Sequence, residues 1–368
     1  MKTIIITDGK YRSSIAAVRT LGQAGYRVVV TQTRSDCPGQ PPVFSSRYVS
    51  EHHWIEGSCR DEAYPHRLLE IIRRYEHPTL LCIGADSLNT VSREEYLFRD
   101  ACDFLIAPPQ VLDALNDKES VQRRGRELGI PVPKQYDRKP DQYPVIIKPH
   151  CGEKFGLKAS ERYVIAHNEA EYPSKLAAMQ VYDPQPLVQE CVKGDGAGAC
   201  LLLDKDGRLI SALCHRRVRE YPITGGPSTC CVSFYDEEMI DQAYRLLRSF
   251  NFVGLAMVEF KGNALLEVNP RIWGSFPMTF CAESPFIANY AAAAAGETVE
   301  YKAKDYKTDV KMRFVLNDTI ATLHYLKHGK LKNAFTGMLD VFRAKEALAC
   351  KDDPQPLRKY ISSSLMRK

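Results

Sequence analysis

The first third of the chain alternates short apolar runs with amphipathic segments, and this order constrains the fold more than any other feature. Residues 2–7 and 27–31 are β-branched runs, and residues 13–24 carry apolar side chains at helical spacing. The same alternation continues, and we predict a helix at 68–75 and strands at 79–83 and 104–107. Such alternation is typical of a parallel sheet with helices on both faces. We therefore predict a Rossmann-like domain over residues 1–110.

Length and charge narrow the class of protein. A chain of 368 residues is too long for one ordinary core, so two or three domains are expected. The net charge of +5 is mild over this length and fits anionic small molecules. No basic run is interleaved with aromatics, which argues against nucleic acid as a partner. No apolar stretch reaches membrane-spanning length, and Asp8 comes too early for a secretory signal. We expect a cytoplasmic protein with no membrane partner.

The twelve cysteines do not suggest a disulfide framework or a zinc site. The sequence has no Cys-x-x-Cys pair, and Cys230 and Cys231 are adjacent. Most of the others lie in apolar runs, where a free thiol behaves as a small hydrophobic group. Reduced thiols agree with the expected cytoplasmic location.

A hairpin near residue 260 groups the residues with the clearest chemistry. Two strands, each with a glutamate between apolar residues, flank the turn Lys261-Gly262-Asn263, which brings Glu259 and Glu267 together. Two such carboxylates repel unless a cation lies between them, and Mg²⁺ binds oxygen ligands and nucleotide phosphates. Asn269 adds a neutral oxygen, and Arg271 adds a planar donor group suited to phosphate. The alternative is an ordinary hairpin with solvated acids.

Two further segments suggest a nucleotide site. A strand ending at Lys148 leads into a loop with spaced glycines and lysines, whose backbone N–H groups suit phosphate oxygens: Gly152, Lys154 and Gly156. A later strand ends in a run that resembles an adenine-reading edge, with an acid where a ribose hydroxyl would lie: Glu190, Cys191, Val192 and Asp195. Each segment alone also fits a solvated surface loop.

Several side chains suggest a site for an anionic substrate. A basic cluster follows the strand at 209–214 and precedes a Gly-Gly loop, and its donors suit phosphate or carboxylate: His215, Arg217, Arg219 and Ser228. Two loops at predicted strand ends in the N-terminal domain add Arg12 and Asp86. The alternative is a solvated strand end on which alternation exposes half of the charges.

Together these motifs resemble the ATP-grasp superfamily, within the carbamoyl-phosphate-synthase-like group of carboxylate–amine ligases. The resemblance runs from the N-terminal sheet to about Phe286. It rests on these segments: Asp117-Lys118, Val-Ile-Ile-Lys148-Pro, 152–156, Gln189 to Gly194, His215 to Thr229, and Glu259 with Glu267-Val-Asn-Pro-Arg271. Cys191 departs from the aromatic or aliphatic residue that is common at its position.

The resemblance implies a mixed α/β and α+β fold, in which a Rossmann-like pre-ATP-grasp domain precedes a two-subdomain ATP-grasp fold. The implied pre-ATP-grasp domain covers 1–110. An N-terminal subdomain with the glycine-rich loop follows at 111–192, and a C-terminal subdomain with the metal site at 193–309. A helical extension covers 310–368. It implies nucleotide contacts from Lys118 and Lys148, with Mg²⁺, or Mn²⁺ in its place, on Glu259, Glu267 and Asn269. Homodimers are common in similar proteins.

The function implied is an ATP-dependent ligase that activates a carboxylate as an acyl phosphate and joins it to an amine. The phosphoryl step needs positioning and charge neutralisation, which we assign to Arg271, Lys148 and Arg217. Small-molecule acids and amines are the expected partners. Two alternatives stay open: carbamoyl-phosphate-like chemistry on bicarbonate, and an ATP-binding module without turnover.

Overall fold

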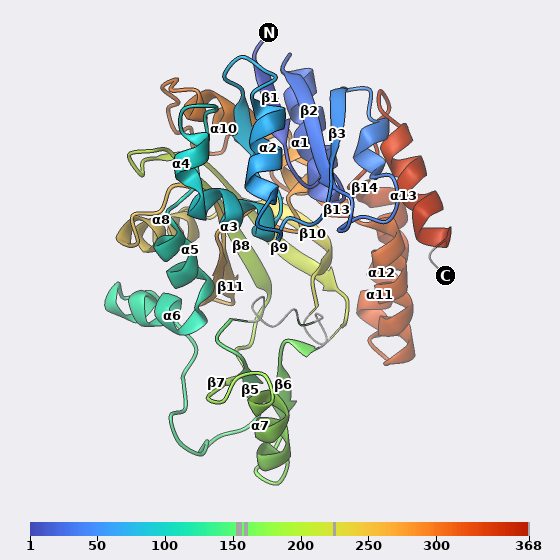
Figure 1. The fold of residues 1–368 in the computed structure, drawn as a ribbon. Coiled ribbons are helices and arrows are strands. Elements are labelled where there is room, and N and C mark those ends of the chain that lie inside the picture. Colours follow the sequence, from blue (N-terminus) through green and yellow to red (C-terminus); the bar gives the residue numbers. More distant parts are fainter. Residues whose placement is uncertain (152–156, 158–160, 224–225, 367–368) are drawn as a thin grey trace.

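The computed structural model describes residues 1–151, 157, 161–223 and 226–366. The arrangement of its elements is shown in Figure 1. Its helices are α1 (Arg12–Gln23), α2 (Tyr64–Ile72), α3 (Ala85–Arg93), α4 (Glu95–Phe98), α5 (Pro109–Asn116), α6 (Lys118–Glu127), α7 (Tyr172–Gln180), α8 (Glu237–Ser249), α9 (Pro277–Cys281), α10 (Phe286–Ala294), α11 (Val315–Lys327), α12 (Leu331–Arg343), α13 (Gln355–Met366) and the 3₁₀ helix η1 (Pro42–Ser45). None of the helices described is both long and apolar enough to cross a bilayer.

The N-terminal sheet is parallel, which confirms the fold predicted for this part of the chain. Its order is β3-β2-β1-β4, and its strands are β1 (Thr3–Ile6), β2 (Arg27–Thr33), β3 (Val49–Ile55) and β4 (Thr79–Leu81). Side chains alternate across it. Ile4 and Ile6 share a core cluster with α1, whereas Ile5 shares one with α2. Helices therefore cover both faces.

The strand predicted at 104–107 is wrong. In the structure only an isolated bridge between Thr79 and Asp103 continues the ladder there. The backbone N–H of Leu105 instead donates to the Tyr290 hydroxyl at 3.2 Å, so a side chain from a distant helix satisfies it. The fourth strand is β3, whose alternation of exposed and buried positions (Val49–Ile55) was not predicted.

Two further sheets follow in the rest of the described chain, and their strands pair antiparallel except for the parallel pair β13–β14. The smaller has the order β6-β5-β7, with strands β5 (Val145–Lys148), β6 (Val164–Ala166) and β7 (Leu187–Glu190). The larger has the order β12-β11-β8-β9-β10-β13-β14, with strands β8 (Gly196–Leu203), β9 (Leu209–Glu220), β10 (Ser228–Phe234), β11 (Gly254–Lys261), β12 (Ala264–Asn269), β13 (Lys311–Arg313) and β14 (Lys345–Glu346). Figure 1 shows the small sheet and α7 set apart from the main body at one end.

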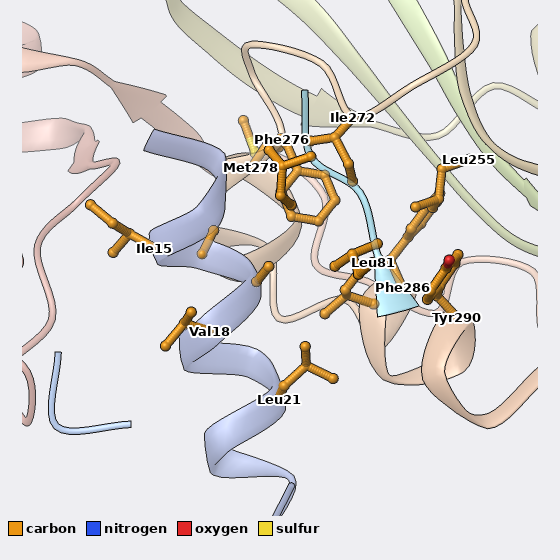
Figure 2. Close-up of a cluster of buried hydrophobic side chains, with 14 of the residues drawn as sticks. Ile15, Val18, Leu21, Leu81, Leu255, Ile272, Phe276, Met278, Phe286 and Tyr290 are labelled. Carbon is orange, nitrogen blue, oxygen red and sulfur yellow. The ribbon is translucent and has the colours of Figure 1, made fainter. Parts of the chain in front are cut away.

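A shared core joins the N-terminal sheet to the larger sheet. Ile15 and Val18 of α1 and Leu81 of β4 lie in one cluster with Leu255 of β11 and Phe276 (Figure 2). The hydroxyl of Tyr290 also donates to the Leu80 carbonyl at 2.8 Å. Because Ile272 belongs to this cluster, the core fixes the segment next to Arg271 against the N-terminal sheet.

The segment after residue 310, predicted as a helical extension, packs against the rest of the protein. It adds β13 and β14 to the larger sheet as well as α11, α12 and α13. Its last part is held to the N-terminal region by the buried ion pair between Arg19 and Asp353, at 2.9 Å. Asp353 also accepts from Ser46 at 2.8 Å. The tail thus belongs to the packed body.

Candidate nucleotide and metal site

Glu259 and Glu267 lie directly opposite each other across the β11–β12 hairpin. Opposed residues of an antiparallel pair point to the same sheet face, with Cβ atoms about 5 Å apart. Asn269 lies two residues beyond Glu267 in β12 and so shares that face. Its side-chain N–H donates to Glu259 Oε1 at 3.0 Å. The hairpin therefore brings together the two acids and the amide, as the sequence predicted.

Cationic side chains from other elements surround this group. Lys118, the first residue of α6, lies 3.2 Å from Glu267 Oε2 through its Nζ. Arg217 of β9 places Nη2 3.5 Å from Glu259 Oε2. Arg271 places Nη2 3.5 Å from Asn269 Oδ1 and donates from Nη1 to the Ile272 carbonyl at 2.8 Å.

The two acids differ in their electrostatic environment. Burial and the neighbouring Glu267 raise the pKa of Glu259 above its ordinary value, although Arg217 opposes the shift. Burial would also raise the pKa of Glu267, but Lys118 and Lys148 outweigh it and lower that pKa. The mutual repulsion and the half-buried position make the pair a better ligand for a cation than two solvated acids. The donor set of two carboxylates and one amide oxygen fits Mg²⁺.

Lys148 ends β5 and is almost fully buried. Burial lowers its pKa to about 8, with Lys118 adding to the fall while Glu267 opposes it. A buried ammonium group near acids can bind an anionic partner such as phosphate. The structure therefore brings Lys148 into the electrostatic range of the acid pair.

The predicted adenine edge lies where the small sheet joins the larger one. Glu190 ends β7 and accepts from the Lys134 backbone N–H at 2.8 Å. Cys191, Val192 and Asp195 follow in the connection to β8, and the carbonyl of Asp195 accepts from the Gly262 N–H at 3.0 Å. This bond ties the connection to the β11–β12 turn.

Two glycines allow that close approach. A Cβ on Gly194 would lie 2.8 Å from the Gly262 Cα, and both residues have positive φ angles, of 115° and 58°. Any side chain at either position would push the turn away from the connection. The contact sets the distance between the predicted adenine edge and the acid pair.

The predicted phosphate loop falls outside the described residues. Gly152, Lys154 and Gly156 belong to 152–156, and part of the Gly-Gly segment falls in 224–225. The prediction that the glycine-rich loop contacts phosphate therefore stays a prediction.

The predicted substrate residues are dispersed. His215 is buried in β9 on the same face as Arg217 and lies 2.8 Å from the Ser275 hydroxyl through Nε2. Burial, followed by Arg217, lowers its pKa to about 4, so the ring is neutral at pH 7. Ser228 donates to the Cys230 carbonyl at 3.0 Å, and Asp86 lies exposed in the first turn of α3, 3.2 Å from Arg60 Nε.

The predicted substrate role of Arg219 is wrong. Its guanidinium is 0% exposed and pairs with Asp318 and Asp340 at 2.8 and 2.7 Å. These partners come from α11 and α12, which the sequence pattern did not place beside β9. A guanidinium with this burial and pairing has no free surface for a substrate.

Arg12 also points away from its predicted role. Its guanidinium lies over the Phe314 ring, 3.7 Å from the centroid, and burial lowers its pKa while Tyr360 and Glu346 oppose the shift. The side chain therefore packs against the tail, which does not support the predicted anion site at the start of α1.

Two features near the site were not predicted. Arg162 lowers the pKa of Glu267, so its charge lies close to the acid pair. Gln189 of β7 donates to Gln122 of α6, which donates to the Leu266 carbonyl at 2.8 Å. This buried relay connects the small sheet to the hairpin. A buried glutamine carries no recognisable sequence signal, and Arg162 follows a loop whose path the sequence does not reveal.

Comparisons with known proteins agree with this geometry. Residues 115–275 match the ATP-grasp domain family. This match spans Lys118, Lys148, Glu259, Glu267 and Arg271. The matched region is the part of the chain in which the sequence motifs indicated an ATP-grasp domain. No curated protein sequence matches the chain at a significant level.

Solved structures show the same fold at low identity. An ADP complex of N5-carboxyaminoimidazole ribonucleotide synthetase has a TM-score of 0.64 and 14% identity, covering 89% of this chain and 85% of that one. The biotin carboxylase domain of Hydrogenobacter thermophilus 2-oxoglutarate carboxylase, solved with MgADP and bicarbonate, has a TM-score of 0.61 and 13% identity, covering 84% and 73%. An L-amino acid ligase from Bacillus licheniformis has a TM-score of 0.55 and 12% identity, covering 80% and 74%. The N-terminal parallel sheet and the following sheets thus form an ATP-grasp fold.

Proposed function

We propose that this protein is an ATP-dependent carboxylate–amine ligase that releases ADP and phosphate. The observation that carries the proposal is the convergence of Glu259, Glu267 and Asn269 on one sheet face, with Lys118 and Arg217 in contact with the two acids. Acids that can hold a cation, ringed by fixed positive charges, suit a triphosphate. The ATP-grasp domain match agrees with this assignment.

The proposed chemistry needs charge neutralisation rather than a protein nucleophile. Mg²⁺, held by Glu259, Glu267 and Asn269, would supply neutralisation of the ATP phosphates. Lys148 would contact the phosphates, and Arg271 would hold the γ-phosphoryl group as the substrate carboxylate attacks it. The resulting acyl phosphate has a good leaving group. An amine then attacks the acyl carbon and phosphate departs.

His215 has a supporting role in this proposal. Its ring is neutral and held by Ser275, so it adds no charge beside Arg217. A protonated imidazole there would repel the guanidinium of Arg217. We propose that His215 positions the sheet face and does not bind the substrate carboxylate directly.

Product analysis with a single variant tests the proposal. We expect acid- and amine-dependent formation of ADP and phosphate by the wild type, and loss of turnover in Glu267→Gln with an unchanged melting temperature. Glu238→Gln, which alters an exposed carboxylate on α8, should behave as wild type. Formation of AMP and pyrophosphate, or normal turnover by folded Glu267→Gln, would contradict the proposal.

A second candidate is activation of bicarbonate. The Hydrogenobacter thermophilus domain of the same fold was solved with bicarbonate. ATP turnover that requires bicarbonate and no other acid would favour this candidate. Turnover that requires an organic acid in bicarbonate-free buffer would favour the ligase.

A further inference from the structure

The two helices α11 and α12 form a hairpin whose outward side is apolar. Most of the large exposed apolar side chains of the described chain lie on it: Val315, Ile320, Leu323, Leu326, Leu331, Phe335, Met338, Val341 and Phe342. Their exposed fractions run from 40% to 91%, the highest being that of Phe342. A patch of this kind is unusual for a surface that faces only water. Figure 1 shows the hairpin at one edge of the molecule, beside α13.

The exposed residues follow helical spacing. In α12, Leu331, Phe335, Met338 and Phe342 recur at intervals of three and four residues and so form one stripe. The buried positions Ala334, Gly337 and Asp340 form another stripe, turned toward the protein. The exposed apolar side chains are therefore a continuous helix face rather than scattered positions.

The acidic side chains of the hairpin are buried and its apolar side chains are exposed, which is the reverse of the usual distribution on a surface helix. Asp318 and Asp340 are buried and pair with Arg219 at 2.8 and 2.7 Å, and Lys311 Nζ lies 2.8 Å from Asp340. A Cβ on Gly337 would collide with the Thr322 side chain, so the two helices pack closely. Because the inner side is fixed by these contacts, the apolar side cannot turn inward.

All the charged side chains left on the outside of the hairpin are basic. Between residues 315 and 343 the only acids are the two buried aspartates, while Lys327, Lys330, Lys332 and Arg343 are exposed. None of the ion pairs found among the described residues involves these four. Three of the four flank the turn between the helices, next to exposed Leu326 and Leu331.

We propose that the α11–α12 hairpin docks on an anionic lipid surface. Exposed leucine and phenylalanine side chains beside lysines are typical of helices that lie at the headgroup level of a membrane. Lysines near such a surface gain attraction from anionic lipids, which complements the basic rim of this face. The contact is peripheral and agrees with the finding that no described helix can cross a bilayer.

A second copy of the chain fits this face less well. A two-fold contact joins the same patch on both subunits, so it would bring the two basic rims together. Like charges across an interface disfavour association. The charge on the hairpin therefore favours an anionic partner over another copy.

Vesicle co-sedimentation of the full chain tests the proposal. We expect binding to mixed phosphatidylglycerol–phosphatidylcholine vesicles, weakening at high salt, and little binding to phosphatidylcholine alone. Lys327→Gln with Lys332→Gln should weaken partitioning about fivefold for each lysine, or roughly 25-fold for both. Phe335→Ser with Phe342→Ser should abolish it. Tyr96→Ser with Val181→Ser removes two exposed apolar groups elsewhere and should leave binding unchanged.

Melting temperatures verify that each variant is folded, and light scattering gives its oligomeric state. Vesicle binding that both hairpin variants weaken would support the proposal. It would be overturned by a wild type that ignores anionic vesicles, or by binding that Phe335→Ser with Phe342→Ser leaves intact. A hairpin-dependent dimer without vesicle binding would also overturn it, as would binding only to an acidic soluble protein.

Discussion

Arg216 and Arg217 are neighbours in β9, yet their side chains leave opposite faces of the sheet. Arg216 is exposed and lies 5.7 Å from the ring centroid of Phe234. Arg217 is half-buried, and its guanidinium contacts Glu259 at 3.5 Å and Glu220 at 3.1 Å. Because side chains alternate along a strand, only Arg217 of these two arginines can contact the acid pair.

The pair of arginines provides a matched test at the residue scale. We expect Arg217→Met to lower kcat/KM for ATP by about 10²–10³-fold, because it removes a fixed positive charge from the phosphate site. Arg216→Met removes the same charge from the other face and should stay within about twofold of wild type, since most surface substitutions have small effects. Steady-state kinetics of both variants measure the difference. Equal losses in the two would rule out a specific role for Arg217.

At this scale the sequence could predict the residues whose positions depend on local pairing. The turn at Gly262 pairs Phe260 with Leu265, so a hairpin that brings Glu259 near Glu267 followed from the sequence. Their exact opposition also needs the register shift between Glu259 and Phe260, which the sequence did not reveal. The burial and pairing of the Arg219 side chain depend on Asp318 and Asp340, which are far away in the sequence. A contact of that range cannot be deduced from strand periodicity.

Among the elements, β9 connects the candidate site to the α11–α12 hairpin. It was expected to end at Cys214, but it continues to Glu220 and so carries both Arg217 and Arg219. The strand pairs with β8 on one side and β10 on the other. Its basic residues therefore lie within a sheet rather than in a loop, and this position explains why only some of them reach the site.

The buried pairing of Arg219 should dominate the stability of the hairpin. We expect Arg219→Met to destabilise the fold by ~3–5 kcal/mol, because Asp318 and Asp340 would lose their main partner while still buried. Arg245→Met removes the exposed pair with Asp241 and an exposed hydrogen bond to the Leu128 carbonyl, and should cost ~1 kcal/mol or less. Urea unfolding followed by circular dichroism provides the comparison. Similar midpoints for the two variants would show that the buried pair contributes little.

For the molecule as a whole, His150 links the small sheet region to the main body. Its Nδ1 lies 2.9 Å from Asp183 Oδ2 and its Nε2 lies 3.0 Å from Glu119 Oε2 of α6. Burial alone would lower the pKa of His150, but the two carboxylates outweigh it and raise that pKa above its ordinary value. When it is protonated, the ring thus bridges two acids on different parts of the fold.

This bridge predicts a defined pH dependence of stability. Because the folded-state pKa is raised, the stabilisation is complete below the ordinary pKa of histidine and is lost as pH rises through the raised value. We expect His150→Gln to lower the melting temperature at acidic pH and to match wild type at alkaline pH. Thermal melts across that range measure the difference. A loss that grows with rising pH would contradict the assignment.

The large-scale fold was predictable only in part. Alternating strands and helices indicated the N-terminal parallel sheet, and the motifs indicated the ATP-grasp fold that follows it. The return of the tail was not predictable, because β13 pairs with β10 through contacts distant in sequence and Asp353 pairs with Arg19. The core shared by Ile15 and Phe276 is likewise a long-range feature.

The most direct test of the central claim is the Mg²⁺ dependence of nucleotide binding. Calorimetry with a non-hydrolysable ATP analogue would compare the wild type with the Glu259→Gln/Glu267→Gln double variant, each with Mg²⁺ and with chelator. If the two acids share the cation that carries the triphosphate, wild type should bind more tightly with Mg²⁺ and the folded double variant should show no Mg²⁺ effect. A double variant that keeps the wild-type dependence on Mg²⁺ would contradict the proposed metal site.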